Sequence, residues 1–162
     1  MAKKEKEVVD TTEASLDADH KEARVYELGF HIDSELPVEE AKKVYQGIRA
    51  KIEAVGVVVA EGEPQKIPLA YTISRGETAG RRDFDASFFA WIAYETDGVG
   101  HETVALTAKE DKRIFRFLDI RTTKDEAKHS AEMSELLAKI EPTETEEVSD
   151  VELDAALKEV GV

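Results

Sequence analysis

A change of apolar period near the start of the chain most constrains its fold. Over residues 24–32 every second residue is apolar, which is typical of a strand with one buried face. After Pro37 the apolar spacing changes to three and four, which predicts an amphipathic helix over residues 38–55. Gly56 is expected to end this helix in a left-handed conformation. The strand positions are Tyr26, Leu28, Phe30 and Ile32, and the helical stripe comprises Ala41, Val44, Ile48, Ile52 and Val55.

A second strand begins at residues 57–60, where the sequence is rich in β-branched residues. Gly62, Pro64 and Pro68 then interrupt it. Because proline cannot donate a ladder hydrogen bond, we expect an edge strand or a bulged one. Extended structure resumes over residues 69–73. Residues 75–82 are predicted to form a loop that carries three arginines.

The third strand is predicted over residues 84–95 and is apolar on both faces. A short helix within residues 102–112 and a last strand over residues 113–122 complete the set. The order is strand, helix, strand, strand, helix, strand. This order predicts an α+β, ferredoxin-like fold, in which a four-stranded antiparallel sheet carries two helices on one face.

The chain is expected to have three parts. Residues 1–23 lack a sustained apolar period and are predicted to be a flexible N-terminal extension. Residues 24–122 form the ferredoxin-like domain. Residues 123–162 are an acidic C-terminal tail with one or two helices, over residues 124–140 and 149–160. Ser149 and Glu152 form a capping box at the start of the second of these.

The net charge of −14 is unevenly distributed along the chain. Residues 123–162 carry 12 acidic and 4 basic side chains, whereas residues 24–122 carry 17 and 14. The middle of the chain is therefore close to neutral and can hold a local basic patch. The absence of cysteine excludes disulfides and thiolate sites and fits a reducing compartment. No apolar run approaches the roughly 20 residues that a bilayer requires, so no membrane partner is expected.

No residue set in the sequence is suited to catalysis, so we expect a protein that is not an enzyme. The four histidines are scattered without ligand spacing, and we expect no metal and no cofactor. The segment from Gly98 to Gly100 lacks the third glycine of a dinucleotide-binding loop and is interpreted as a turn. Asp33 and Asp83 have no recognisable histidine partner for hydrolysis.

Two groups of basic residues are candidates for phosphate contacts with RNA. A solvated loop, with Arg75 paired to Glu77 and Arg81 paired to Asp83, is the alternative for the first group. For the second group, Arg116 alternates with apolar residues, and a structural ion pair is as plausible as an RNA contact. The first group is Lys66, Arg75, Arg81 and Arg82, and the second is Lys112, Arg113, Arg116 and Arg121.

In the predicted strands, apolar residues occur at both odd and even positions, so both faces of the sheet carry them. One of these two sets must face away from the two helices. Exposed aromatic patches usually serve a binding function. A protein partner, or the chain's own C-terminal helix, is the preferred interpretation, and base stacking is a weaker one because the third strand lacks a basic-glycine-aromatic run. The predicted protein-partner residues are Phe89, Trp91, Phe115 and Phe117.

Four motifs in order resemble the bacterial small-subunit ribosomal protein six family. They cover about 100 residues and comprise Arg24-Val25-Tyr26-Glu27-Leu28, Leu69-Ala70-Tyr71-Thr72-Ile73, Ala93-Tyr94-Glu95 and Ile114-Phe115-Arg116-Phe117-Leu118. The resemblance implies a structural constituent of the small ribosomal subunit in the cytoplasm. It also implies binding of small-subunit ribosomal RNA together with the neighbouring small-subunit ribosomal protein eighteen. The alternative is a ferredoxin-like regulatory or oligomerisation module that binds a small molecule or itself.

Overall fold

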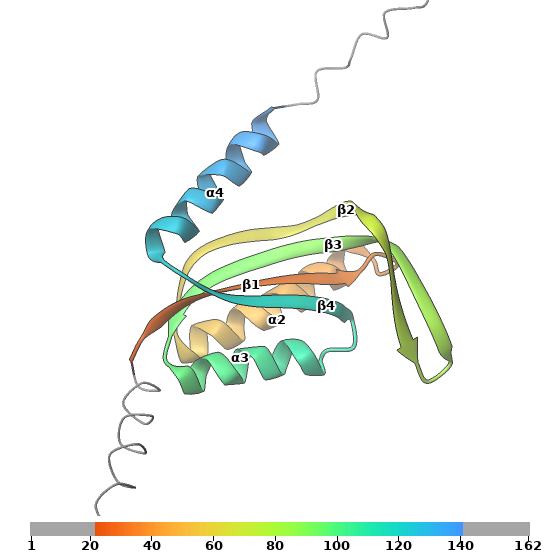
Figure 1. Cartoon of the computed structure of the whole chain (residues 1–162), viewed down its shortest axis with the longest axis horizontal. Helices are drawn as coiled ribbons and strands as arrows, with labels where there is room; N and C mark the ends of the chain where they lie inside the picture. Colours follow the sequence, from red (N-terminus) through yellow and green to blue (C-terminus); the bar gives the residue numbers. More distant parts are fainter. Residues whose placement is uncertain (1–21, 141–162) are drawn as a thin grey trace, which may run out of the picture. The chain divides into compact units, whose positions relative to one another are not determined.

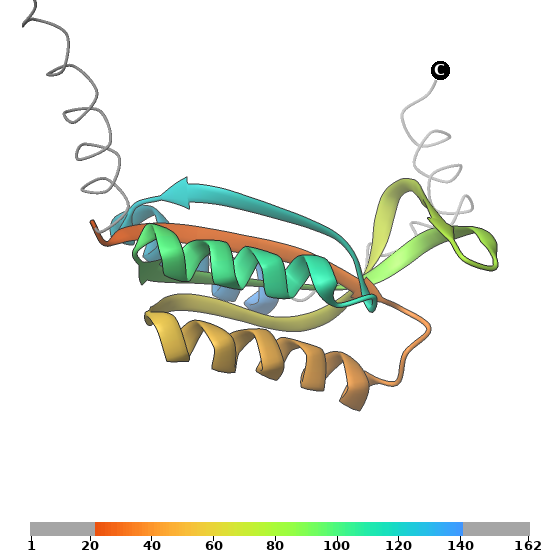
Figure 2. The same cartoon turned by 90° about the horizontal axis from the view of Figure 1, so that it is seen from below.

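Four strands form one antiparallel sheet in the computed structural model, which describes residues 22–140. The strand order is β2-β3-β1-β4. Two helices, α2 and α3, lie on one face of this sheet (Figures 1 and 2). The ferredoxin-like α+β fold predicted from the element order is confirmed. The elements are β1 (Arg24–Asp33), α2 (Val38–Val55), β2 (Val57–Glu77), β3 (Gly80–Thr96), α3 (Gly98–Glu110), β4 (Ile114–Thr122) and α4 (Lys124–Lys139).

The core lies between the two central strands and the two helices that cover them. The alternating residues of β1 are buried as predicted, and Leu28, Phe30 and Ile32 are fully inaccessible to solvent. The predicted stripe of α2 packs in the same cluster. Sequence reasoning missed Tyr45, which is buried on α2 and donates a hydrogen bond from its hydroxyl group to Glu61 at 2.8 Å.

β2 is one strand of 21 residues rather than two pieces, and it lies at the edge of the sheet. Its pairing with β3 shifts at three places, which absorb Pro64 and Pro68 without ending the strand. The prediction of an edge strand with bulges is confirmed. The prediction of a loop over residues 75–82 is wrong, because β2 and β3 stay paired as far as Glu77 and Gly80. Gly80 has φ +126°, a conformation that suits glycine at this tight turn.

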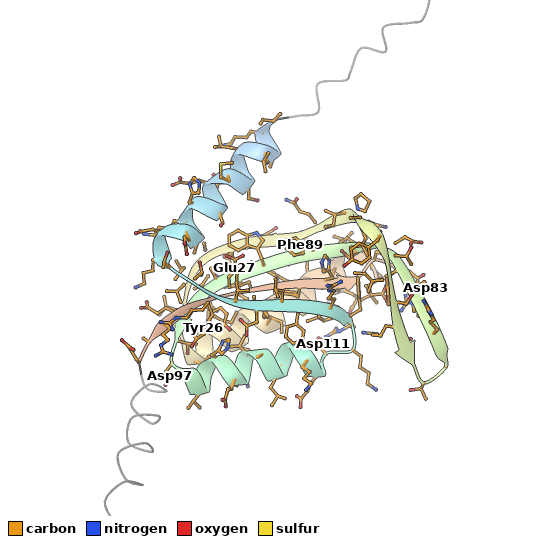
Figure 3. All side chains as sticks on the ribbon, viewed as in Figure 1. Tyr26, Glu27, Asp83, Phe89, Asp97 and Asp111 are labelled. Carbon is orange, nitrogen blue, oxygen red and sulfur yellow. The ribbon has the colours of Figure 1, made fainter. Side chains whose placement is uncertain are left out.

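α3 begins earlier than the predicted range of 102–112. Gly98 and Gly100, interpreted as parts of a turn, lie in its first turn. Asp97 caps the helix by accepting a hydrogen bond from the Gly100 N–H at 2.8 Å. Figure 3 labels Asp97 and Asp111 at the two ends of this helix. The sequence signal for this start was the aspartate cap, which the glycine pair obscured.

Gly56 ends α2, but it does not adopt the predicted left-handed conformation. Its backbone is extended, with φ −166°, and its N–H donates to the carbonyl of Ile52 at 2.8 Å. A Cβ atom at this position would lie 2.3 Å from the carbonyl oxygen of Glu95. The glycine is therefore required by the close approach of β3 and not by its φ angle.

The predicted domain limits coincide with the first residue of β1 and the last residue of β4. The chain divides into two units, Met1–Ala131 and Glu132–Val162. The predicted N-terminal extension falls almost entirely on residues 1–21, and the helix predicted over residues 149–160 on residues 141–162; both ranges lie outside the described residues. None of the helices within residues 22–140 is long and apolar enough to span a bilayer.

Two glycine substitutions test this account of α2. Gly47→Ala is expected to stabilise the fold by roughly 0.5–1 kcal/mol, because a Cβ atom there meets nothing within 4 Å and alanine favours a helix. Gly56→Ala is expected to destabilise it by more than about 1 kcal/mol, because backbone must move to make room. Urea denaturation measures both free energies of unfolding, and equal effects of the two changes would contradict the close approach at Gly56.

Candidate functional site

The hairpin of β2 and β3 projects beyond the other two strands (Figure 1). We call its distal part, residues 73–84, the hairpin arm; its paired ends are Ile73 and Phe84. Figure 3 shows Asp83 on this arm. The arm carries Arg75, Arg81 and Arg82, three of the eight residues predicted to bind RNA.

Arg75 ties the hairpin arm to the start of β4. Its guanidinium group donates to the carbonyl oxygens of Lys112 at 3.0 Å and Ile114 at 3.2 Å. It also pairs with Glu77 at 2.7 Å, as the loop interpretation had suggested. Arg75 is therefore a structural bridge as well as a cation.

Arg82 joins the arm to the end of β1. It pairs with Asp33 at 2.6 Å and with Glu35, and it lies 4.7 Å from the centre of the Phe84 ring. The hydrogen bond to Asp33 raises the pKa of the Arg82 guanidinium above its usual value. Two carboxylates thus neutralise this cation in the folded protein.

Arg113 is held by Asp111 through both its Nε and Nη2 atoms, at 3.0 and 2.8 Å. These bonds lower the pKa of the Asp111 carboxyl group. Arg113 lines a notch of about 560 Å³ between the arm and the start of β4, which we call the basic notch. The notch is lined by Asp33, Arg75, Gly76, Glu77, Thr78, Ala79, Arg82, Lys112 and Arg113.

The basic notch brings together four of the predicted RNA-binding residues from two distant parts of the chain: Arg75, Arg82, Lys112 and Arg113. The other four, Lys66, Arg81, Arg116 and Arg121, do not line it. The Arg81 side chain is 74% exposed on the arm and pairs with Asp83 at 3.3 Å, as the loop interpretation had suggested.

The face of the sheet opposite the helices, which we call the open face, carries part of the predicted protein-partner set. Phe89 and Trp91 lie there, opposite His31 and Gly29 of β1. Phe115 stacks on Phe84 with ring centroids 4.1 Å apart, and it also contacts His31.

Phe117 differs from the other three predicted partner residues. It pairs with Phe30 and packs against the core on the helix side. A β-bulge between His31 and Ile32 shifts the pairing with β4, so that the two aromatic residues of β4, Phe115 and Phe117, have different surroundings. A partner on the open face would therefore meet Phe89 and Trp91 before Phe117.

A pocket of about 640 Å³ occupies the open face, which we call the open-face pocket. Residues Ile67 to Tyr71 of β2 form one wall, and Leu118 and Ile120 of β4 form the other. Its floor includes Glu27, Gly29, His31 and Phe89. Sequence reasoning missed Glu27, Gly29 and His31 as site residues. The sequence could have indicated them, because they alternate with the buried residues of β1 and must therefore lie on the other face of the sheet.

The ionisable groups of this pocket are partly desolvated. Burial raises the pKa of the Glu27 carboxyl group. Burial, together with the positive charge of Arg116, lowers the pKa of His31. The His31 Nδ1 atom lies 2.7 Å from the hydroxyl oxygen of Ser87, which is fully buried. These effects favour an uncharged imidazole at neutral pH and leave Arg116 as the cation of the pocket.

A second polar cluster lies apart from the candidate sites. The Nε2 atom of His101 on α3 is 3.1 Å from Asp119, and its ring stacks on Tyr26 at a centroid distance of 3.7 Å. Burial raises the pKa of Asp119, and the neighbouring His101 acts in the opposite direction. Within residues 22–140, no group of three or more His, Asp or Glu side chains is placed to hold a metal ion.

Comparisons with known proteins give a fold-level likeness. No protein-family model matches the sequence, and no curated protein matches it either. The chain is similar to the crystal structure of 30S ribosomal protein S6 from Thermotoga maritima, at 19% sequence identity over 73% of this chain and 99% of that chain, with a TM-score of 0.49. This likeness concerns the arrangement of strands and helices, and the function must be argued from the residues of this chain.

The electrostatics of the open-face pocket can be tested at His31. Arg116→Gln is expected to raise the pKa of His31, because it removes a positive charge that opposes protonation. Since the folded pKa lies below the unfolded one, His31 reduces stability as the pH falls below about 6.5, and the variant should lose less stability there. NMR titration of the imidazole signals measures the shift. Arg121→Gln is the control, and an equal response to both changes would contradict this assignment.

Proposed function

We propose that this protein is an RNA-binding structural component of the small ribosomal subunit. The supporting observation is the basic notch, where four cations from β2, β3 and the segment before β4 converge beside an arm that carries exposed Arg81. The four sequence motifs that resemble the ribosomal protein six family support the same proposal. Binding rather than catalysis is the proposed activity.

The notch suits phosphate contacts that position the protein without reading base sequence. Arginine and lysine side chains that contact the backbone of RNA give affinity and orientation. Lys112 and Arg81 are the best placed, because their side chains need not leave a buried partner. Arg75 and Arg82 would mainly hold the arm in position.

A protein neighbour is part of the proposal. Leu118 and Ile120 of β4 and Tyr71 of β2 are apolar and exposed at 67%, 44% and 64%. Exposed apolar groups along a sheet face are suited to a partner surface. These three side chains also line the open-face pocket, so a protein partner there and a ligand in that pocket would compete for them. By the motif resemblance, we propose small-subunit ribosomal protein eighteen as that partner, and the cytoplasmic ribosome as the location.

Sedimentation of ribosomal subunits tests the proposal directly. The protein is expected in small subunits at unit stoichiometry by mass spectrometry, and high salt should release it because phosphate contacts displace counterions. Its absence from subunits at low salt would refute the proposal. A stable homodimer without RNA would instead favour the second candidate, a regulatory or oligomerisation module, which the exposed apolar edge residues of β4 also suit.

Charge reversal at Lys112 of the notch and at Arg81 of the adjacent hairpin arm tests the RNA surface. The double variant Arg81→Glu with Lys112→Glu is expected to weaken RNA binding at least tenfold and to lower the salt dependence by about one unit for each phosphate group that the variant no longer binds. Filter binding at several salt concentrations measures both quantities. Lys42→Glu with Lys51→Glu, on exposed positions of α2, is the matched control. An equal loss of affinity in both variants would indicate a general charge effect and would remove both the notch and the hairpin arm from the site.

A further inference from the structure

At the centre of its floor, the open-face pocket has a glycine, Gly29, and therefore no side chain. Gly29 lies between Trp91 of β3 and Leu118 of β4 in the sheet register. The Cβ position that Gly29 lacks is 3.5 Å from the ring of Phe89. A flat group can therefore lie on the backbone of β1 beside an aromatic ring. The volume of about 640 Å³ is within the usual range for small-molecule sites.

The pocket also contains two unmatched charges of opposite sign. Arg116 donates a hydrogen bond to the hydroxyl group of Tyr71 at 2.9 Å, but no carboxylate within residues 22–140 forms an ion pair with it. Arg75, Arg82 and Arg113 all have such partners. Glu27 likewise has no ion-pair partner in the described part of the chain, although its carboxyl group is partly buried.

These two charges lie at opposite ends of the pocket. Glu27 pairs with Ile120 in the sheet, and Arg116 is four residues away from Ile120 along β4. A strand advances about 3.3 Å per residue, so the two backbone positions are about 13 Å apart. Figure 3 shows Glu27 and Phe89 on the sheet, at a distance from the arm that bears Asp83. A complementary occupant has an anionic group at one end, a hydrogen-bond donor at the other and a flat apolar group between them.

The wall formed by β2 adds polar backbone to this arrangement. Residues 69–72 have no partner residue on β3, because the register shifts between Pro68 and Ile73. Leu69, Ala70 and Tyr71 line the pocket. Because these residues lie outside the paired positions of the β2–β3 ladder, we expect their backbone groups to hydrogen-bond the edge of a planar heterocycle. A fatty acid would instead place hydrocarbon against Glu27 and leave these groups unused, which is unfavourable.

We propose that the open-face pocket binds a nucleoside monophosphate, with the base over Gly29 beside Phe89, the phosphate at Arg116 and an amino group of the base toward Glu27. The ligand is either a free nucleotide or an unpaired nucleotide of an RNA chain, and the chemistry of recognition is the same. Only the second source rests on the proposed RNA-binding function. The position of Glu27 favours adenine, cytosine and guanine, which carry an exocyclic amino group, over uracil.

Calorimetry and NMR on the full chain test this proposal with AMP, CMP, GMP, UMP, cytidine and inorganic phosphate. The three amino-bearing nucleotides are expected to bind more tightly than UMP and cytidine, and to shift the amide signals of Gly29, Phe89 and residues 69–71. Inorganic phosphate should leave the signals of Gly29 and Phe89 unchanged. Absence of these shifts with every nucleotide at millimolar concentration would overturn the proposal, and so would equal binding of UMP and CMP.

Three variants localise the binding. Arg116→Gln is expected to weaken CMP binding at least tenfold through loss of a charge-assisted hydrogen bond, whereas Arg121→Gln on the same strand should have no effect. Gly29→Val fills the floor and should abolish binding; its Cβ atom would lie at an ordinary contact distance of 3.5 Å from the Phe89 ring. Glu27→Leu should make CMP and UMP bind equally.

Unchanged CMP binding in both Arg116→Gln and Gly29→Val would overturn the proposal. If Gly29→Val unfolds, CMP binding by Arg116→Gln alone decides.

A single-stranded hexanucleotide distinguishes the two sources of the nucleotide. Tighter binding of the hexanucleotide than of CMP, abolished in Gly29→Val, supports an unpaired nucleotide of RNA; equal binding supports a free nucleotide. The double variant Arg81→Glu with Lys112→Glu separates this proposal from the proposed function, because it should reduce RNA binding and leave CMP binding unchanged. Loss of CMP binding in that variant would contradict a separate pocket.

Discussion

The burial of alternate residues on β1 and β3 against α2 is the constraint on which the rest of the structure depends. Leu28, Phe30 and Ile92 are fully buried on the helix side. A shift of the register by one residue would move this set to solvent, at a cost of about 1.5–3 kcal/mol for each large side chain. Because that parity is fixed, Gly29 and Phe89 must lie on the open face. The floor of the pocket is therefore a direct consequence of how the core is packed.

Elements whose signals are local could be predicted from the sequence. The bounds of α2 follow from its apolar period, and the edge position of β2 follows from its two prolines. The hairpin arm could not be predicted in the same way. Residues 75–82 have the composition of a loop, and they remain in a ladder because Arg75 and Arg82 are held by groups 37 to 49 residues away along the chain. Such long-range bonds leave no periodic trace in the sequence.

The same distinction applies to the candidate site. The pairs Arg75–Glu77 and Arg81–Asp83 are two residues apart and could be anticipated from sequence, and both form. The pairing of Arg82 with Asp33 could not. The pocket residues Glu27 and Gly29 were predicted only as parts of a strand, because an acidic residue and a glycine on a solvent-facing parity carry no distinctive pattern. Their meaning depends on the β2 wall opposite them, which the register shift after Pro68 creates.

The arginines of the two candidate sites differ in whether a carboxylate of the protein forms an ion pair with them. In the basic notch, Asp33 and Glu77 already neutralise Arg82 and Arg75, so a phosphate must compete with carboxylates for them. Affinity there has to come from several weak contacts, and it should depend steeply on salt. Arg116 has no such competitor within residues 22–140, and it borders the open-face pocket, where Glu27 and His31 are partly buried. If both proposals hold, an anionic group at Arg116 would therefore stay bound at salt concentrations that release RNA from the notch.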